Sequence, residues 1–188
     1  MSPLEIIASA IGVCAVWLTV RQNRWCWPLG LVMVLMYAWI FYDGKLYSNM
    51  LLQGVYAVLQ GYGWWLWTRG GEAHTGVQVS KLSRHGILKS LAIGAVGAVM
   101  LGYLMARFTD AAAPWQDAAL CALSLVAQVW MAQKRVECWP LWIVLDLLFV
   151  ALFIQQGLYP TAALYGLFTL LAVNGWITWR RDRALANT

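Results

Sequence analysis

The sequence predicts an all-α integral membrane protein of seven transmembrane helices, arranged as two parallel three-helix repeats joined by one further helix. Three observations predict this fold: an apolar composition, seven apolar segments and an internal repeat. Hydrophobic residues make up 62% of the chain and charged residues 11%, whereas an ordinary soluble domain is about 45–50% apolar and about 25% charged. A soluble protein of 188 residues could not bury so much apolar surface, so most of the chain is expected to face lipid.

Seven apolar segments are separated by short polar loops. They lie at about residues 3–20, 27–42, 48–68, 87–106, 114–133, 139–155 and 159–179. Each of the five prolines opens one segment, at Pro3, Pro28, Pro114, Pro140 and Pro160, where a missing N–H removes no helical hydrogen bond. Several segments are shorter than the ~20 residues of an upright span, so flanking aromatic residues are expected to complete the crossing. The N-terminus has no basic region before its first apolar stretch, which is therefore expected to be a retained helix rather than a signal peptide.

An internal repeat relates residues 26–69 to residues 138–181 at one constant offset, without gaps. Sixteen of the 44 positions are identical. The matches include Cys26-Trp27-Pro28-Leu29 with Cys138-Trp139-Pro140-Leu141, and Gly63-Trp64-x-x-Trp67 with Gly175-Trp176-x-x-Trp179. Shared hydrophobicity does not explain paired Trp, Pro and Gly, so the repeat predicts two structurally equivalent three-helix bundles.

The segment at about 87–106 has no counterpart in the repeat. Three helices are an odd number, so this extra span is needed to bring both repeats into the membrane in the same direction. The resulting 3+1+3 layout is that of SWEET-type transporters, with a substrate path between the bundles. We predict a first bundle at 1–68, a cytoplasmic linker at 69–86, a linker helix at 87–106, a second bundle at 107–180 and a cytoplasmic tail at 181–188. The glycines and mixed charges of the linker predict that it is flexible.

The basic residues predict the orientation of the chain in the membrane. Alternate loops place 11 of the 13 on one side: Arg21, Arg24, Arg69, Lys81, Arg84, Lys89, Lys134, Arg135, Arg180, Arg181 and Arg183. Lys45 and Arg107 fall on the other side. By the positive-inside rule the N-terminus is outside and the C-terminus is cytoplasmic. The net charge of +5 is thus attributed to topology, and no nucleic-acid partner is expected.

Neither a metal nor a cofactor is expected. The four cysteines, Cys14, Cys26, Cys121 and Cys138, form no CxxC motif and no pairing with histidine that is typical of a metal site. The two histidines, His74 and His85, both fall in the predicted linker and are interpreted as solvated side chains.

Asp146 is the one acid well inside a predicted span. It lies about 10 Å along its helix from the cytoplasmic end, and an Asp at the centre of a span costs at least ~2.5–3.5 kcal/mol on insertion scales. Its counterpart in the repeat is Val34, so the fold itself does not require an acid there. An Asp hydrogen-bonded to a neighbouring helix is one interpretation, and a position on the substrate path is the favoured one.

Three amides fall at a similar depth to Asp146: Gln60, Gln128 and Asn174. Each alone could be a polar contact between helices, but together with Asp146 they predict a ligand site. Trp142 lies one helical turn from both Trp139 and Asp146, and an aromatic plate beside a carboxylate suits a flat cationic ligand. The other tryptophans near the cytoplasmic ends are expected in an interfacial belt: Trp25, Trp27, Trp64, Trp65, Trp67, Trp176 and Trp179.

These residues resemble the PnuC family of nicotinamide riboside transporters over nearly the whole chain. The resemblance rests on Val136–Asp146 with its Trp139-x-x-Trp142 pair, on Gln155–Tyr165, on Asp117…Ser124…Gln128 and on Gly63-Trp64-x-x-Trp67. It implies a full-length SWEET-like fold, a homotrimer in the bacterial inner membrane, and facilitated diffusion of a vitamin precursor that cytosolic phosphorylation then traps. Similar family members carry thiamine or riboflavin. The sequence departs from some members in having Asp146 in place of Asn.

The resemblance and the polar residues together predict a passive transporter for a cationic heteroaromatic vitamin, with nicotinamide riboside preferred and thiamine or riboflavin as alternatives. Trp142 would stack on the ring, Asp146 would face its positive charge, and Gln128 and Asn174 would bind ribose or amide groups. The predicted site also includes Gln60, Trp139, Tyr165 and Gln53.

Three other functions are disfavoured. A membrane enzyme is not expected, because the chain has no HExxH or GxSxG motif, no second buried acid and no histidine within a span. A non-transporting assembly or sensor protein would not need polar side chains at mid-depth. A sugar-carrying SWEET would be favoured by prolines in mid-helix, which the chain lacks.

Overall fold

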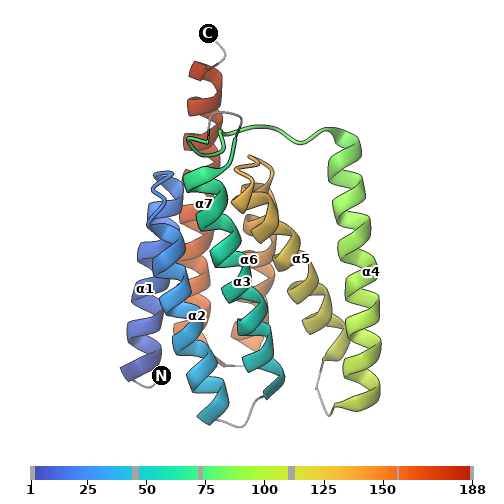
Figure 1. The fold of residues 1–188 in the computed structure, drawn as a ribbon. Coiled ribbons are helices and arrows are strands. Elements are labelled where there is room, and N and C mark those ends of the chain that lie inside the picture. Colours follow the sequence, from blue (N-terminus) through green and yellow to red (C-terminus); the bar gives the residue numbers. More distant parts are fainter. Residues whose placement is uncertain (1–2, 44–46, 72–73, 110–112, 156, 187–188) are drawn as a thin grey trace.

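A computed structural model describes residues 3–43, 47–71, 74–109, 113–155 and 157–186, and these residues form a bundle of seven helices (Figure 1). The helices are α1 (Pro3–Val20), α2 (Cys26–Asp43), α3 (Tyr47–Arg69), α4 (Arg84–Phe108), α5 (Pro114–Ala132), α6 (Cys138–Gln155) and α7 (Tyr159–Ala186). Each of the seven predicted apolar segments is a helix. The C-terminus, the linker and the α1–α2 and α5–α6 loops lie at one end of the bundle (the C-terminal end, at the top of Figure 1).

Two helix boundaries differ from the prediction. α4 begins at Arg84, inside the predicted linker, because the Ser83 hydroxyl accepts a hydrogen bond from the Gly86 N–H at 3.1 Å and caps the helix. α7 continues to Ala186, so most of the predicted tail is helical. The added turn has no glycine or proline, and the Gln22 amide donates to Asp182 at 2.6 Å.

Four helices of the described residues are both long and apolar enough to cross a membrane: α1, α4, α6 and α7. α2 contributes a shorter apolar stretch, Cys26–Ile40. α3 and α5 carry more polar side chains, among them Gln53, Gln60 and Gln128. The chain is therefore a multi-pass membrane protein in which some helices are adapted to protein neighbours more than to lipid.

Six of the helices close a ring of contacts. Within each half, α1 packs on α2 and α2 on α3, and likewise α5 on α6 and α6 on α7. Two contacts join the halves: α3 with α5 (the first seam) and α1 with α7 (the second seam). In the described part of the chain α4 packs against α5 alone, and it stands at the edge of the bundle (Figure 1).

Four buried tryptophans (the tryptophan core) fill the C-terminal end of the ring. Trp27, Trp67, Trp139 and Trp179 are each at most 5% exposed. Trp27 meets Trp67 edge to face at 5.4 Å between ring centroids, and their repeat counterparts Trp139 and Trp179 meet in the same way at 5.2 Å. The prediction of an interfacial belt was therefore wrong for Trp27, Trp67 and Trp179. Trp25, in contrast, is 59% exposed, as a belt residue would be.

Two glycines make room for this core. A side chain at Gly63 would overlap the Trp27 ring, and a side chain at Gly175 would lie 2.5 Å from Cζ2 of Trp139. The helix backbones of α3 and α7 therefore serve as flat surfaces for an indole. Because the two glycines leave space for the large rings, the rings pack inside the bundle instead of at its lipid-facing edge.

Hydrogen bonds from the core join the two halves. The Trp67 indole N–H donates to the Ala132 carbonyl at 2.9 Å across the first seam. The Trp179 indole N–H donates to the Val20 carbonyl at 3.2 Å across the second seam. The two donors are counterparts at the offset of the repeat, and so are the two acceptors. The two bonds therefore occupy equivalent positions in the two halves.

The second part of the linker is held in place by hydrogen bonds, which corrects the prediction of a flexible segment there. Residues 76–82 (the linker strap) run along the α5–α6 loop: the Ser80 N–H donates to the Lys134 carbonyl at 3.0 Å, and the Val136 N–H donates to the Ser80 carbonyl at 3.1 Å. Valines and a leucine of the strap pack against the tryptophan core. Gly76, with φ +102°, passes so close to the Trp67 carbonyl that a side chain there would meet it at 2.5 Å. A glycine at position 76 is therefore explained by the close approach of two backbone segments and not by freedom of movement.

The glycine surfaces predict a paired effect on stability. Gly63→Ala and Gly175→Ala should each lower the free energy of unfolding by about 1–3 kcal/mol, because the new methyl group displaces a buried indole. Gly54→Ala and Gly166→Ala, also repeat counterparts, have nothing within 4 Å of the new methyl group and should leave stability unchanged or slightly raised. Thermal unfolding of the purified protein in detergent measures all four. Equal losses at all four positions would show that the tryptophan core does not depend on these surfaces.

Candidate functional site

Inside the ring, away from the tryptophan core toward the other end, a set of polar side chains converges around Tyr165. Asp146 on α6 is 4% exposed. Tyr165 on α7 has Asp146, Tyr56 on α3 and Tyr37 on α2 as its electrostatic neighbours. Four of the six ring helices therefore direct a polar side chain to one region.

The two remaining ring helices add hydroxyl groups to this set. Ser124 on α5 lies beside the Tyr56 hydroxyl. The Ser9 hydroxyl on α1 lies 3.4 Å from that of Tyr37. Every ring helix thus contributes one member to this group (the polar layer): Ser9, Tyr37, Tyr56, Ser124, Asp146 and Tyr165. Such a layer is chemically able to bind a ligand that has hydroxyl groups and a charge.

Aromatic rings border the polar layer. Tyr165 packs against Phe149, Phe153 and Phe168, with centroid distances of 4.9, 5.2 and 5.6 Å. Phe149 and Phe153 stack on each other at 6.0 Å. The acid therefore lies between the tryptophan core on one side and a phenylalanine cluster on the other, and its side chain is buried.

Asp146 has no basic partner among the described residues, since no Lys, Arg or His there lies within ion-pair distance of it. A buried carboxylate without a counter-charge is unfavourable. In the same residues no group of three or more His, Cys, Asp and Glu could hold a metal ion. The described residues therefore supply neither a counter-charge nor a metal site for an ionised Asp146.

Trp142 and Gln60 lie at positions where the two repeats differ strongly in side-chain size. Trp142 is half-buried between the two hydrophobic clusters of the bundle, and its indole N–H is buried without an acceptor in the described structure. Gln60 is 8% exposed and covers Gly30, whose side chain, if present, would lie 2.7 Å from the Gln60 Oε1. The repeat counterparts of Gly30 and Gln60 are Trp142 and Ala172, so the large and the small residue are exchanged between the halves.

The structure brings together some of the predicted site residues. Asp146 and Tyr165 are neighbours in the polar layer. Gln128 is half-buried one turn after Ser124 on α5, and Gln53 is half-buried on α3, at the repeat counterpart of Tyr165. Trp139 belongs to the tryptophan core, where its ring is fully packed, so it supports the site without being free to stack on a ligand.

Asn174 is a correction, because the structure does not bring it to the polar layer. Its side chain is exposed and accepts a hydrogen bond from the Thr178 hydroxyl at 3.2 Å. Leu170 and Ile177, one turn before and after it, are also exposed. The sequence placed Asn174 at the right depth in the membrane, but depth does not determine which way a side chain points around its helix.

Sequence reasoning missed Ser9, Tyr37 and Tyr56, and quoted Ser124 only as part of a motif. One signal was present in the repeat. Tyr37 and Tyr56 have Phe149 and Phe168 as counterparts, so both positions are aromatic in each half while only the first half carries the hydroxyl. A position that is aromatic in both repeats, but carries a hydroxyl group in only one of them, would have indicated a side chain that faces the interior of the ring.

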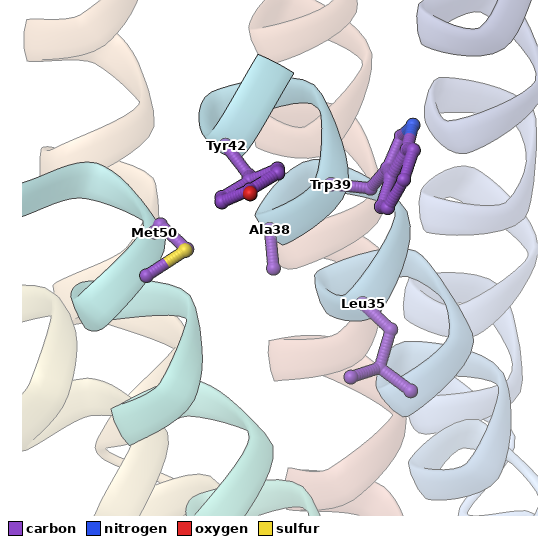
Figure 2. A pocket seen from close by; sticks show the side chains of 5 residues that line it. All are labelled: Leu35, Ala38, Trp39, Tyr42 and Met50. Atoms are coloured by element: carbon purple, nitrogen blue, oxygen red, sulfur yellow. The ribbon is translucent and has the colours of Figure 1, made fainter. Parts of the chain in front are cut away.

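Two hollows lie on the outside of the bundle. One of about 350 Å³ is lined by Leu35, Ala38, Trp39, Tyr42 and Met50, and Figure 2 shows Tyr42 and Met50 facing each other across the gap between α2 and α3. The other, of about 380 Å³, lies between α4 and α5. Neither is lined by a residue of the polar layer, and their apolar surfaces suit lipid chains.

Known proteins with similar sequences and structures form one group. Residues 2–181 match the family model described as nicotinamide mononucleotide transporter. The chain is 26% identical to the nicotinamide riboside transporter PnuC of Escherichia coli (strain K12), over 97% of this chain and 88% of that protein. It is 27% identical to the riboflavin/roseoflavin transporter RibM of Streptomyces davaonensis, over 95% of this chain and 86% of that protein. A crystal structure of the vitamin B3 transporter PnuC matches with a TM-score of 0.77 and 27% identity, over 95% of this chain and 80% of that chain.

Proposed function

The chain belongs to the nicotinamide mononucleotide transporter family, and we propose that it carries nicotinamide riboside across the membrane by facilitated diffusion. The membership confirms the resemblance found in the sequence. One observation carries the choice of substrate: Asp146 is a buried carboxylate among aromatic rings, with no basic partner in the described residues. Nicotinamide riboside has a flat aromatic ring with a fixed positive charge, which supplies the missing counter-charge. Phosphorylation in the cytosol would then trap the substrate.

The proposed roles follow from the side chains. Trp142 stacks on the pyridinium ring, through a cation–π attraction of up to ~2 kcal/mol when desolvated, and its unpaired indole N–H is available to an acceptor on the substrate. Asp146 faces the ring charge. The hydroxyls of Tyr56 and Tyr165, with the amides of Gln60 and Gln128, are donors and acceptors for ribose and carboxamide.

Riboflavin is the second candidate, because RibM is described as a riboflavin/roseoflavin transporter. Its ring system is neutral, however, and gives a buried carboxylate no counter-charge. Thiamine, also a flat cation, offers Asp146 the same counter-charge but has no ribose or carboxamide for the surrounding hydroxyls and amides. The relatives and the resemblance thus leave three vitamins, and the acid favours the two that are cations.

We also propose the 3+1+3 architecture with parallel SWEET-like repeats and all seven helices in the membrane, with the two bundles at 1–68 and 107–180 joined by a linker and α4. The matched seam hydrogen bonds from Trp67 and Trp179 support it. So do the α1–α2 and α5–α6 loops, in which the repeat counterparts Gln22 and Lys134 have φ of 53° and 51°. The expected homotrimer stays a prediction.

The orientation remains the one that the basic residues predict, with the N-terminus outside and the C-terminus in the cytoplasm of a bacterial inner membrane. A reporter enzyme fused after Thr188 should read cytoplasmic, and one inserted at Asp110 should read external. A cytoplasmic signal at Asp110 would mean that the number of spans is wrong.

A thermal-shift measurement tests the substrate. Nicotinamide riboside at 100 times its dissociation constant should stabilise the purified protein by roughly 2.7 kcal/mol; thiamine should stabilise it less, and riboflavin not at all. Trp142→Ala should weaken binding by up to roughly 30-fold, since it removes the stacking plate. Trp65→Ala, an exposed tryptophan near the C-terminal end, is the matched control and should bind as the unaltered protein does. Stabilisation by riboflavin alone would favour the second candidate.

The charge of Asp146 predicts how transport is driven. A carboxylate that faces a fixed cation serves it best when ionised, and a proton would compete with the cation for the same position, which opposes symport. Labelled nicotinamide riboside should therefore equilibrate across proteoliposomes without accumulating, with or without an inward proton gradient. Asp146→Asn should weaken binding by at least roughly tenfold, because a desolvated ion pair is lost. Accumulation that needs the gradient and vanishes in Asp146→Asn would instead identify Asp146 as a proton-coupling residue.

A further inference from the structure

The two seams occupy equivalent positions in the repeat, but different contacts hold them together. Each contact of the first seam has a counterpart position in the second, at the offset of the repeat, and the two seams differ at three levels along the bundle. A transporter must open its substrate path at one end by separating its halves somewhere. The difference between the seams therefore bears on where the path opens.

At the level of the tryptophan core, the first seam has the shorter hydrogen bond. The Trp67 indole N–H donates to the Ala132 carbonyl alone, at 2.9 Å. Its counterpart, the Trp179 indole N–H, is shared between the Thr19 and Val20 carbonyls at 3.3 and 3.2 Å. A shared, longer bond constrains the ring less than one well-directed bond.

At the level of the polar layer, the described residues make a polar contact across the first seam and an apolar contact across the second. The Tyr56 hydroxyl on α3 faces the Ser124 hydroxyl on α5, so both sides of this contact are polar. The counterparts in the second seam are Phe168 and Gly12, and the phenyl ring lies 3.6 Å from the position of a Gly12 side chain. This second contact is apolar, so at this level α7 can move against α1 without separating polar partners.

At the C-terminal end, the loop residues Lys134 and Gln22 are counterparts with the same left-handed backbone conformation. The Lys134 ammonium lies 4.5 Å above the Trp67 ring, a cation–π contact across the first seam. Burial lowers the pKa of Lys134 below its ordinary value. Gln22 instead reaches the α7 extension and donates to Asp182 at 2.6 Å, the one side-chain pair that the described residues form across the second seam at this end.

The linker strap connects the end of α3 to the α5–α6 loop, and so it adds a second connection across the first seam. It is anchored on the end of α3, since the N–H groups of Gly70 and Val77 both donate to the Leu66 carbonyl, at 3.0 and 3.2 Å. It then binds the α5–α6 loop through Ser80, and its Leu82 N–H donates to a Glu137 carboxylate oxygen at 3.1 Å. In the second half α7 simply continues as a helix to Ala186, so no equivalent described segment crosses from α7 to the α1–α2 loop.

We propose, on the basis of the transport function proposed above, that the two halves pivot on the first seam and part at the second. The substrate then leaves the polar layer toward the C-terminal end between α1 and α7. Opening the second seam breaks one shared indole hydrogen bond and the Gln22–Asp182 pair. Opening the first seam would break the Trp67 bond, a cation–π contact and the hydrogen bonds of the strap, and it would separate Tyr56 from Ser124. The repeat thus supplies a symmetric bundle, and the linker makes one of its seams the hinge.

Cross-linking tests the proposal with one cysteine pair for each seam. Gln22→Cys with Asp182→Cys joins two side chains that touch across the second seam. Ser80→Cys with Arg135→Cys joins two residues that face each other in a single β-bridge between the strap and the α5–α6 loop. None of these four residues belongs to the polar layer. Cys14, the exposed native cysteine, is replaced by Ser in both variants, and a short bismaleimide serves where oxidation is incomplete.

Uptake of labelled nicotinamide riboside into proteoliposomes is measured before oxidation, after oxidation and after reduction. The second-seam cross-link should lower uptake at least tenfold, reversibly, while the first-seam cross-link should leave it within twofold. Equal inhibition by both cross-links, or none by the second-seam cross-link, overturns the proposal. Absence of uptake by the uncross-linked protein would instead contradict the proposed transport function, so the two failures are distinguishable.

Discussion

The bundle depends on the contact between an indole ring and a bare stretch of helix backbone, made twice. Trp27 lies on Gly63 and Trp139 lies on Gly175. In lipid no hydrophobic force brings helices together, so close packing on small residues and buried hydrogen bonds must do so. The tryptophans that these rings meet edge to face also donate across the seams. The indole–glycine contact therefore joins the second helix of each half to the third helix. The indole hydrogen bond then joins the third helix to the opposite half. The polar layer takes its position from that frame.

The tryptophan–glycine contacts occur in both halves of the bundle, but the polar side chains of the polar layer differ between the halves. Aromatic rings stand at equivalent positions in both halves, whereas Asp146 corresponds to Val34 in the first half, and Tyr165 to Gln53. A site on a pseudo-twofold axis sees both halves at once, so an asymmetric ligand requires this difference. Several residues that hold the helices together match across the repeat, whereas Asp146 and Tyr165 of the polar layer do not. The exchange of Gly30 and Gln60 for Trp142 and Ala172 is a further difference between the halves.

Much of the fold could be predicted from the sequence, because apolar length, proline position and a gapless repeat are one-dimensional signals. The helix positions and the pairing of Asp146 with aromatic residues follow from them. The direction in which a side chain points around its helix is not such a signal, so Asn174 was placed inside the bundle although it is exposed. Burial of Trp67 depends on its neighbours in space, which composition does not give. The strap was misjudged because Gly76 looks the same in a sequence whether it allows motion or a close approach.

An acid at this position sets a limit on how firmly the site can hold its substrate. Transfer of Asp146 out of water is unfavourable, and under the proposed function a cationic ring would offset part of that cost only while it is bound. The carboxylate therefore favours entry of the cation, but each increment of attraction also slows its release. A second acid would bind more tightly and transport more slowly. Aromatic rings and hydroxyls around a single carboxylate share the binding among weaker contacts, which can be exchanged one at a time as the second seam parts. A single acid among aromatic rings thus suits a carrier that must release its substrate without an energy source.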